Sequence, residues 1–253
     1  MSEDSKFHAD RIRVDGYTVF EGLLTTAHVE AMYEAFVRLM QEHSQQESAN
    51  RGANRFQMYL PFTAPFAETS VYENDRVLSV VEAVFGNANF ANAPDSVTAA
   101  CTYFASDTPL PGSDYQPVHS DTRLLFPETP LSLPSYGLVL NIPLVTVTEE
   151  NGPLEIWPGG THLWPGGSDM AALAAKMQSV RLKMKRGDVL LRDLRMWHRG
   201  TPNRSDHMRP NVALVYTRPW YRFEQKPPVI AQAAWDGLSE RAKKLFRFAA
   251  VTP

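Results

Sequence analysis

The amino-acid sequence predicts a mainly β domain with flanking helices, and two observations support this prediction. From about residue 97, short apolar runs alternate with clusters of proline, glycine, asparagine and aspartate, a texture typical of antiparallel strands in a sandwich or barrel. The 253 residues also include 19 prolines and 14 glycines, which favour frequent turns over a helical bundle. Because the sequence contains neither an internal repeat nor a linker, we expect a single domain over residues 1–253.

The part of the chain before about residue 95 is expected to be mostly helical. Residues 15–24 have the pattern of a short strand and turn. A helix is predicted from Thr25 or Thr26 to about residue 43, because apolar residues recur there at helical spacing. A second helix is predicted from residue 74 or 75 up to Gly86, since glycine often follows the last residue of a helix.

The predicted β core extends from about residue 96 to 222. A short helix is expected over residues 171–177, between strands, and a closing helix over residues 235–249. The apolar runs that we expect to form the main strands are Val97–Phe104, Tyr136–Val147, Leu154–Trp157, Val189–Leu191 and Asn211–Trp220.

Composition disfavours several classes of partner. The formal net charge of −3 argues against a surface for nucleic acid or anionic membranes. Cys101 is the single cysteine, so no internal disulfide can form, and its place in an apolar run indicates a buried thiol. Residues 1–10 are polar, and no apolar run is long enough for a signal peptide or a membrane span. We therefore expect a cytoplasmic protein, either monomeric or homodimeric.

A pair of potential metal ligands lies in the segment Gln116–Asp121. In extended backbone, residues i and i+2 point to the same face, so His119 and Asp121 project together. A second histidine from elsewhere in the chain would complete one face of an octahedral site. Two histidines and one carboxylate, with three positions left open, are the ligand set that selects non-haem iron(II) for oxygen chemistry.

His198 is the candidate for that second histidine. It follows an apolar strand and precedes a Gly-x-Pro turn, which places it at the rim of a barrel. Arg209 lies eleven residues further on, at the start of the next strand, from which its guanidinium could bind a carboxylate at two points. Taken singly, each feature also fits a structural role, as a hydrogen-bonded loop histidine, a histidine at a strand end or a surface salt bridge.

Together these features resemble the phytanoyl-CoA dioxygenase family of iron(II)- and 2-oxoglutarate-dependent oxygenases. The resemblance runs from Asp15 to about Tyr216, and its most specific part is Glu149–His162, with Asn-Gly-Pro-Leu followed by Pro-Gly-Gly-Thr-His. The other segments that carry it are His119–Asp121, Gly187–Val189, His198 and Arg209. The resemblance implies a double-stranded β-helix, or jelly roll.

The resemblance also implies roles for individual residues. The His-x-Asp pair and the distal histidine would bind iron(II), and Arg209 would bind the distal carboxylate of 2-oxoglutarate. By register, Asn141 and Tyr103 would line the co-substrate site. Gly200 stands where the family often has a serine, which leaves Thr201 to supply a hydroxyl contact.

The expected cofactors are iron(II), 2-oxoglutarate and O2, with ascorbate as a supporting reductant. Relatives that halogenate are expected to carry a small residue in place of Asp121, so hydroxylation or another oxidation is favoured. Desaturation, epimerisation and ring closure stay open, because the position of the substrate decides the product.

The expected substrate is a small or medium-sized metabolite, since no run of basic residues marks a site for coenzyme A. Gln116 and Arg123 flank the iron motif and either face the substrate or lie in solvent. Two other functions compete with the oxygenase: a jelly-roll binding protein without catalysis, and a cupin-like metalloenzyme that does not use 2-oxoglutarate.

Overall fold

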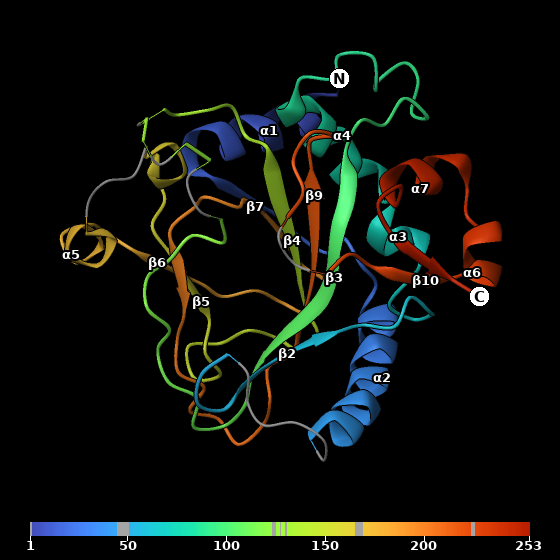
Figure 1. Ribbon diagram of the computed structural model, residues 1–253. Coiled ribbons are helices and arrows are strands. Elements are labelled where there is room, and N and C mark those ends of the chain that lie inside the picture. Colours follow the sequence, from blue (N-terminus) through green and yellow to red (C-terminus); the bar gives the residue numbers. More distant parts are fainter. Residues whose placement is uncertain are drawn as a thin grey trace.

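The computed structural model describes residues 2–44, 51–122, 125–126, 128–129, 131–164, 169–223 and 226–253. Its centre is a six-stranded antiparallel sheet in the order β1-β7-β4-β9-β3-β2, and a three-stranded sheet in the order β6-β5-β8 lies beside it (Figure 1). The two sheets enclose a cavity. The predicted mainly β class, a jelly roll with flanking helices, is confirmed.

The strands of both sheets are short to medium in length. The large sheet contains β1 (Tyr17–Phe20), β2 (Arg55–Tyr59), β3 (Ala100–Pro109), β4 (Gly137–Pro143), β7 (Val189–Asp193) and β9 (Asn211–Thr217). The small sheet contains β5 (Leu154–Ile156), β6 (Val180–Leu182) and β8 (His198–Gly200), and a separate parallel pair is formed by β10 (Val229–Ala231) and β11 (Ala250–Thr252).

Most helices lie in the N-terminal third and at the C-terminal end of the chain. They are α1 (Glu3–Asp15), α2 (Thr26–Ser44), α3 (Thr69–Tyr72), α4 (Asp75–Phe85), the 3-10 helix η1 (Thr161–Leu163), α5 (Met170–Ala174), α6 (Gln232–Asp236) and α7 (Glu240–Leu245). The predicted limits of α2 and α4 are confirmed. Asn74 caps α4 by accepting from the backbone N–H groups of Arg76 and Val77, and Gly86 ends the helix with φ of 83°.

The large sheet has an apolar outer face and a mixed inner face. In β4, Leu138, Leu140 and Ile142 belong to the main core, which also contains buried residues of α1, α2 and α4. The residues between them, Val139 and Asn141, line the cavity instead. This alternation follows from the two-residue period of a strand, and it decides which side chains can reach the site.

The closing helix predicted over residues 235–249 is wrong. The chain forms α6 and α7 there, and β11 begins at Ala250. Gly237 ends α6, and Ser239 starts a new helix by accepting from the backbone N–H of Ala242. A glycine and an N-cap serine two residues apart therefore divide the segment, although its apolar residues suit one helix.

The N-terminal part contains β1, which confirms the strand expected within residues 15–24, and β2, a strand that was not predicted. β1 and β2 form the two edges of the large sheet, paired with β7 and β3. The first helix, α1, lies in a segment for which the sequence indicated only polar character. Its ends are nevertheless capped, by the Ser2 side chain and by Gly16 at φ of 83°. Within the described ranges, none of the helices combines the length and apolar character that crossing a membrane requires.

Candidate metal centre

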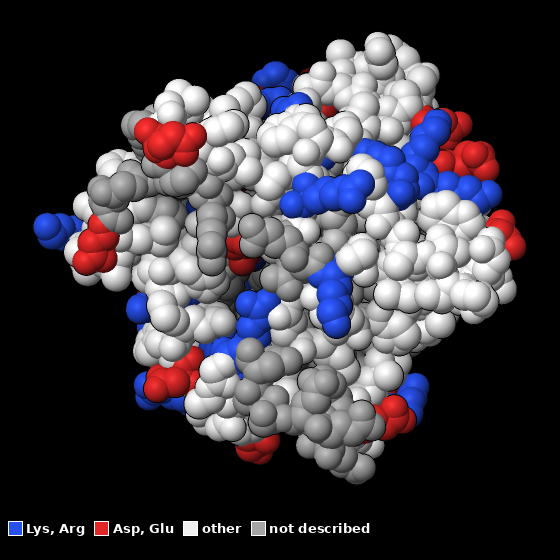
Figure 2. Space-filling view, viewed as in Figure 1, with Lys and Arg blue, Asp and Glu red and all other residues white. Residues whose placement is uncertain are grey.

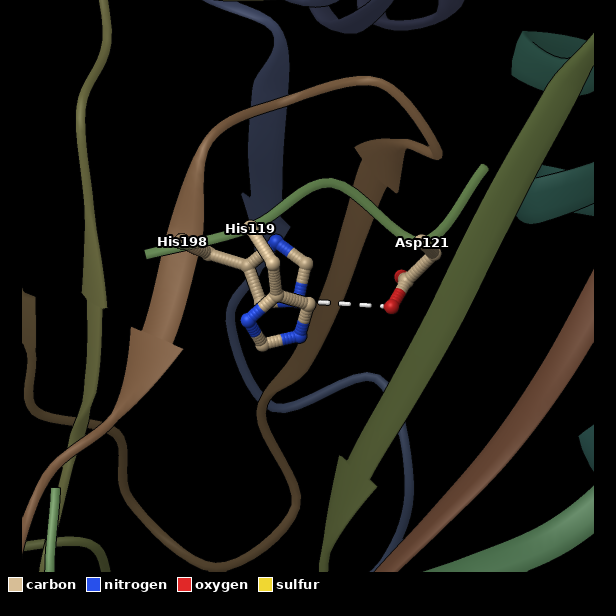
Figure 3. Close-up of side chains that lie close together, drawn as sticks. All are labelled: His119, Asp121 and His198. Atoms are coloured by element: carbon tan, nitrogen blue, oxygen red, sulfur yellow. Dashed lines mark ion pairs between the residues drawn. The ribbon is translucent and has the colours of Figure 1, made fainter. Parts of the chain in front are cut away.

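Three potential ligands from two distant stretches of chain meet at the cavity. His119 and His198 form an antiparallel bridge in which each backbone N–H donates to the carbonyl of the other, at 3.0 and 2.9 Å. This bridge joins the His-x-Asp segment to β8. One ligand atom from each of His119, Asp121 and His198 lies within 4.8 Å of the others (Figure 3). The predicted two-histidine, one-carboxylate group is thus assembled in space.

The hydrogen bonds of the two imidazoles engage Nδ1 of each ring and leave Nε2 available to bind a metal. Nδ1 of His119 lies 2.8 Å from the carbonyl oxygen of Pro117, and Nδ1 of His198 lies 2.9 Å from that of Met196. A carbonyl oxygen only accepts, so each Nδ1 carries the proton and each Nε2 keeps its lone pair. Fixing the tautomer through the second nitrogen is the usual way in which proteins orient a metal-binding histidine.

A buried arginine, Arg192, controls the electrostatics of these ligands. Its Nη2 lies 2.7 Å from Oδ2 of Asp121, while Oδ1 of the same carboxylate lies 3.4 Å from Nε2 of His198. Burial alone would raise the pKa of Asp121, but Arg192 and the histidines outweigh it and hold that pKa well below its usual range. Burial, aided by Arg192, lowers the pKa of His198 to about 4. The carboxylate is therefore charged and the imidazole neutral, as metal binding requires.

The cavity beside these ligands has a volume of about 130 Å³. In Figure 2, Lys and Arg atoms are visible inside a hollow near the centre of the face shown. Apolar walls come from both sheets, including Val139, Leu154 and Leu190. Of the predicted site residues that the structure describes, all but Thr201 line it, namely His119, Asp121, His198, Arg209, Asn141, Tyr103 and Gln116.

Arg209 is a buried cation without a hydrogen-bond acceptor in the part of the chain that the structure describes. Only 6% of the residue is exposed, and its guanidinium donates no hydrogen bond to any of the described residues. Burial lowers its pKa to about 10, although the nearby charge of Asp107 opposes this shift. A buried charge is costly unless it is paired, so this guanidinium is suited to an anionic ligand in the cavity.

Three other predicted residues have side chains that are hydrogen-bonded within the protein. Gln116 accepts at Oε1 from the backbone N–H of Gly200 at 3.0 Å, and the Tyr103 hydroxyl accepts from Nε2 of Gln57. Thr201 is buried, and its hydroxyl donates to the carbonyl of Pro153 at 2.7 Å, so the structure does not bring that hydroxyl to the cavity.

Two further arginines bear on the site. Arg123 lies outside the described residues. Arg192 was missed, although the sequence held a clue, because a charged residue within an apolar strand needs a buried partner.

Comparison with known proteins gives one family and several similar structures. A family model described as phytanoyl-CoA dioxygenase (PhyH) matches residues 12–211. The non-haem α-ketoglutarate-dependent epimerase SnoN from nogalamycin biosynthesis has 20% identity and a TM-score of 0.61, over 85% of this chain and 82% of its own. AviO1 from Streptomyces viridochromogenes has 19% identity and a TM-score of 0.62, over 90% and 100%. EctD from S. alaskensis, solved with bound iron, has 20% identity and a TM-score of 0.63, over 90% and 80%.

Proposed function

Because the chain belongs to the phytanoyl-CoA dioxygenase family and is a 2-oxoglutarate-dependent non-haem iron enzyme, we propose that it hydroxylates an unactivated C–H bond of a small or medium-sized metabolite. The family predicted from the sequence is confirmed. The observation that carries the proposal is the His-Asp-His group at a cavity that also holds the buried guanidinium of Arg209, which donates no hydrogen bond to the described residues. This donor set and this cation fit iron(II) and a dicarboxylate.

The three ligands would hold the metal on one face. His119 and His198 would bind through Nε2, since Nδ1 of each is held by a carbonyl, and Asp121 would bind through Oδ1. Bound iron(II) and 2-oxoglutarate supply an oxidant from O2, with succinate and CO2 as the other products. Asp121 would supply a carboxylate ligand where a halogenating relative is expected to carry a small residue, which favours hydroxylation over halogenation.

Arg209 and Asn141 would orient the co-substrate. Arg209 precedes β9, whose first residue pairs with Pro143 of β4, and Asn141 lies two residues earlier on the inner face of β4. A dicarboxylate lying along this face would reach the guanidinium with one end and the metal with the other. The apolar walls would exclude water and so strengthen both charge interactions.

The substrate class is inferred from the site and from similar structures. The cavity carries apolar walls and few charges beyond those assigned above. One similar structure, SnoN, was solved with Fe3+, α-ketoglutarate and nogalamycin RO, a small-molecule ligand. Both observations support a small or medium-sized metabolite rather than a macromolecule as substrate.

Anaerobic titration with iron(II) and 2-oxoglutarate tests the site. We expect a weak visible charge-transfer band that is lost in Asp121→Ala. Metal binding without this band would favour the cupin-like alternative. Absence of the band in the wild-type protein, or its persistence unchanged in Asp121→Ala, would contradict the ligand assignment.

Succinate release across a library of metabolites, with iron(II) and ascorbate present, tests the reaction. We expect one substrate class to stimulate release and to gain one oxygen atom by mass spectrometry. Loss of two hydrogens, or no change in mass, would replace hydroxylation by desaturation or epimerisation. A band without stimulated turnover on any metabolite would favour the binding protein without catalysis.

A further inference from the structure

Arg192 lies at an unusual place for a charged residue. It belongs to β7, whose register pairs it with Val139 of β4 and with Tyr17 of β1. The neighbouring Leu191 points to the apolar core, so Arg192 points to the cavity, where only 5% of it is exposed. A cation inside a sheet is costly, and what it contacts therefore indicates why it is there.

The first contact of Arg192 gives the two oxygens of Asp121 different partners. Oδ2 lies 2.7 Å from Nη2 of the arginine, a charge-assisted distance, and Oδ1 is left beside the histidines. A carboxylate that binds iron through both oxygens would fill one of the positions needed by 2-oxoglutarate and O2. With Oδ2 directed at Arg192, Oδ1 would be the oxygen that faces the metal, and three positions would stay open.

The second contact of Arg192 sets the orientation of Asn141. Nε of the arginine donates to Oδ1 of Asn141 at 3.2 Å. Because an arginine nitrogen can only donate, the amide oxygen must face it and the amide NH2 must face away. That NH2 group has no hydrogen-bond partner among the described residues, and Asn141 lines the cavity. The donor is therefore turned toward the place where a carboxylate would lie.

We propose that Arg192 is a positioning residue that organises both halves of the site. Through Asp121 it restricts the metal to one carboxylate oxygen, and through Asn141 it aims a donor at 2-oxoglutarate. This inference rests on the proposed function of the same cavity. The remaining nitrogen, Nη1, is buried without a partner among the described residues. The arginine is therefore not held in the sheet by a complete set of hydrogen bonds, and its contacts with Asp121 and Asn141 are the ones that explain its position.

A second arginine–aspartate pair in the same segment provides the matched control. Arg195 contacts Asp193 through Nε at 2.8 Å and through Nη2 at 2.9 Å, so both oxygens of that carboxylate are engaged. Asp193 is fully buried, and neither residue lines the cavity. Loss of this pair should affect stability alone, whereas loss of the Arg192 contacts should affect the site.

The test uses Co(II), whose visible spectrum reports its ligands without turnover, together with anaerobic 2-oxoglutarate titration of the iron(II) protein. In Arg192→Met, we expect an altered Co(II) spectrum and a 2-oxoglutarate Kd raised roughly tenfold. Arg192→Lys should restore the Co(II) spectrum, because one ammonium can still hold Oδ2, but it should not restore the affinity that depends on Asn141. Arg195→Met should lower the unfolding midpoint and leave both site measurements unchanged.

A double-mutant cycle separates the two contacts. Asn141→Ala should weaken 2-oxoglutarate binding and leave the Co(II) spectrum unchanged. Adding Asn141→Ala to Arg192→Lys should cause little further loss of affinity, because both changes remove the same oriented donor. This cycle decides the proposal even if Arg192→Met does not fold.

Two outcomes would overturn the inference. One is a folded Arg192→Met with the wild-type Co(II) spectrum and wild-type 2-oxoglutarate affinity. The other is full additivity of Asn141→Ala and Arg192→Lys. Failure of the proposed function is distinguishable, because the wild-type iron(II) protein would then lack the charge-transfer band, while the Co(II) spectra would still report on the role of Arg192.

Discussion

The two faces of the large sheet are built from the same strands but serve different ends. On the outer face, Leu140 and Leu191 are buried in the main core with the helices. On the inner face, Asn141 and Arg192 follow them by one residue and line the cavity. Neighbours in the sequence thus belong to different environments, because strand side chains alternate. The direction of a side chain, more than its place along the strand, therefore decides whether its loss affects stability or chemistry.

The largest expected effect comes from His198 at the cavity. Loss of a residue that merely supports a metal ligand costs roughly 10–100-fold in metal affinity or activity, and loss of a ligand should exceed this. In His198→Ala and in His119→Ala we expect succinate production to fall below detection, while circular dichroism and the cooperative unfolding transition are kept. Near-normal succinate production by either folded variant would contradict the assignment and remove the distinction between the faces.

The next effect comes from the outer face. Leu140 is 1% exposed and belongs to the main core, so Leu140→Ala leaves a space that its neighbours fill only in part. We expect the free energy of unfolding to fall by about 3 kcal/mol in denaturant titrations. At temperatures where the variant is folded, its charge-transfer band and 2-oxoglutarate Kd should match the wild type. A weakened band would show that the two faces are coupled.

A smaller effect is expected at Arg209, where both consequences can be measured in one variant. Arg209→Met removes the partner proposed for a carboxylate, so the Kd for 2-oxoglutarate should rise roughly a hundredfold, or about 2.7 kcal/mol. It also removes a buried charge that donates no hydrogen bond to the described residues, so the unfolding midpoint should stay unchanged or rise. Arg199→Met is the control, since Arg199 pairs with Glu155 and does not line the cavity. An unchanged Kd for 2-oxoglutarate would mean that a residue other than Arg209 binds its distal carboxylate.

The sequence was sufficient to predict the metal group because its pattern is local. His119 and Asp121 are two residues apart in extended backbone, which fixes their common direction without tertiary information. His198 and Arg209 were placed from the sequence at the end of one strand and the start of the next, and the structure brings all four residues to one cavity. Helices with strong caps, such as the one that ends at Gly86, were predicted for the same reason.

What the sequence could not give depends on tertiary contacts. β2 begins with Arg55, whose charge gave no sign of burial in the sequence, yet it is 2% exposed and donates to the carbonyl of Thr201 at 2.6 Å. The hydroxyl of Thr201 is directed by its bond to Pro153 and not by its position in the motif. Arg192 is similar, because its role depends on Asn141 and Asp121, which lie far from it in the sequence.

The smallest expected effect is on the pH dependence of stability, and it comes from a histidine that is buried outside the cavity. His162, in η1, lies 3.2 Å through Nε2 from the carbonyl of Arg13, and burial lowers its pKa. Nearby charges act in both directions, since Asp193 and Asp15 raise this pKa and Arg195 lowers it. The unfolded chain, with an imidazole pKa of 6.5, therefore takes up the proton first as pH falls.

The stability contributed by neutral His162 is thus present above pH 6.5 and is lost as pH falls from there toward the folded pKa. Unfolding free energies measured between pH 8 and pH 5 should decline in the wild type and decline less steeply in His162→Gln, whose amide can still donate to a carbonyl. The 2-oxoglutarate Kd of this variant at pH 8 should equal that of the wild type, because His162 does not line the cavity. Equal slopes in the two proteins would mean that protonation of His162 does not differ between the folded and unfolded states. A changed Kd would mean that η1 is coupled to the site, so that a residue outside the cavity can affect chemistry as well as stability.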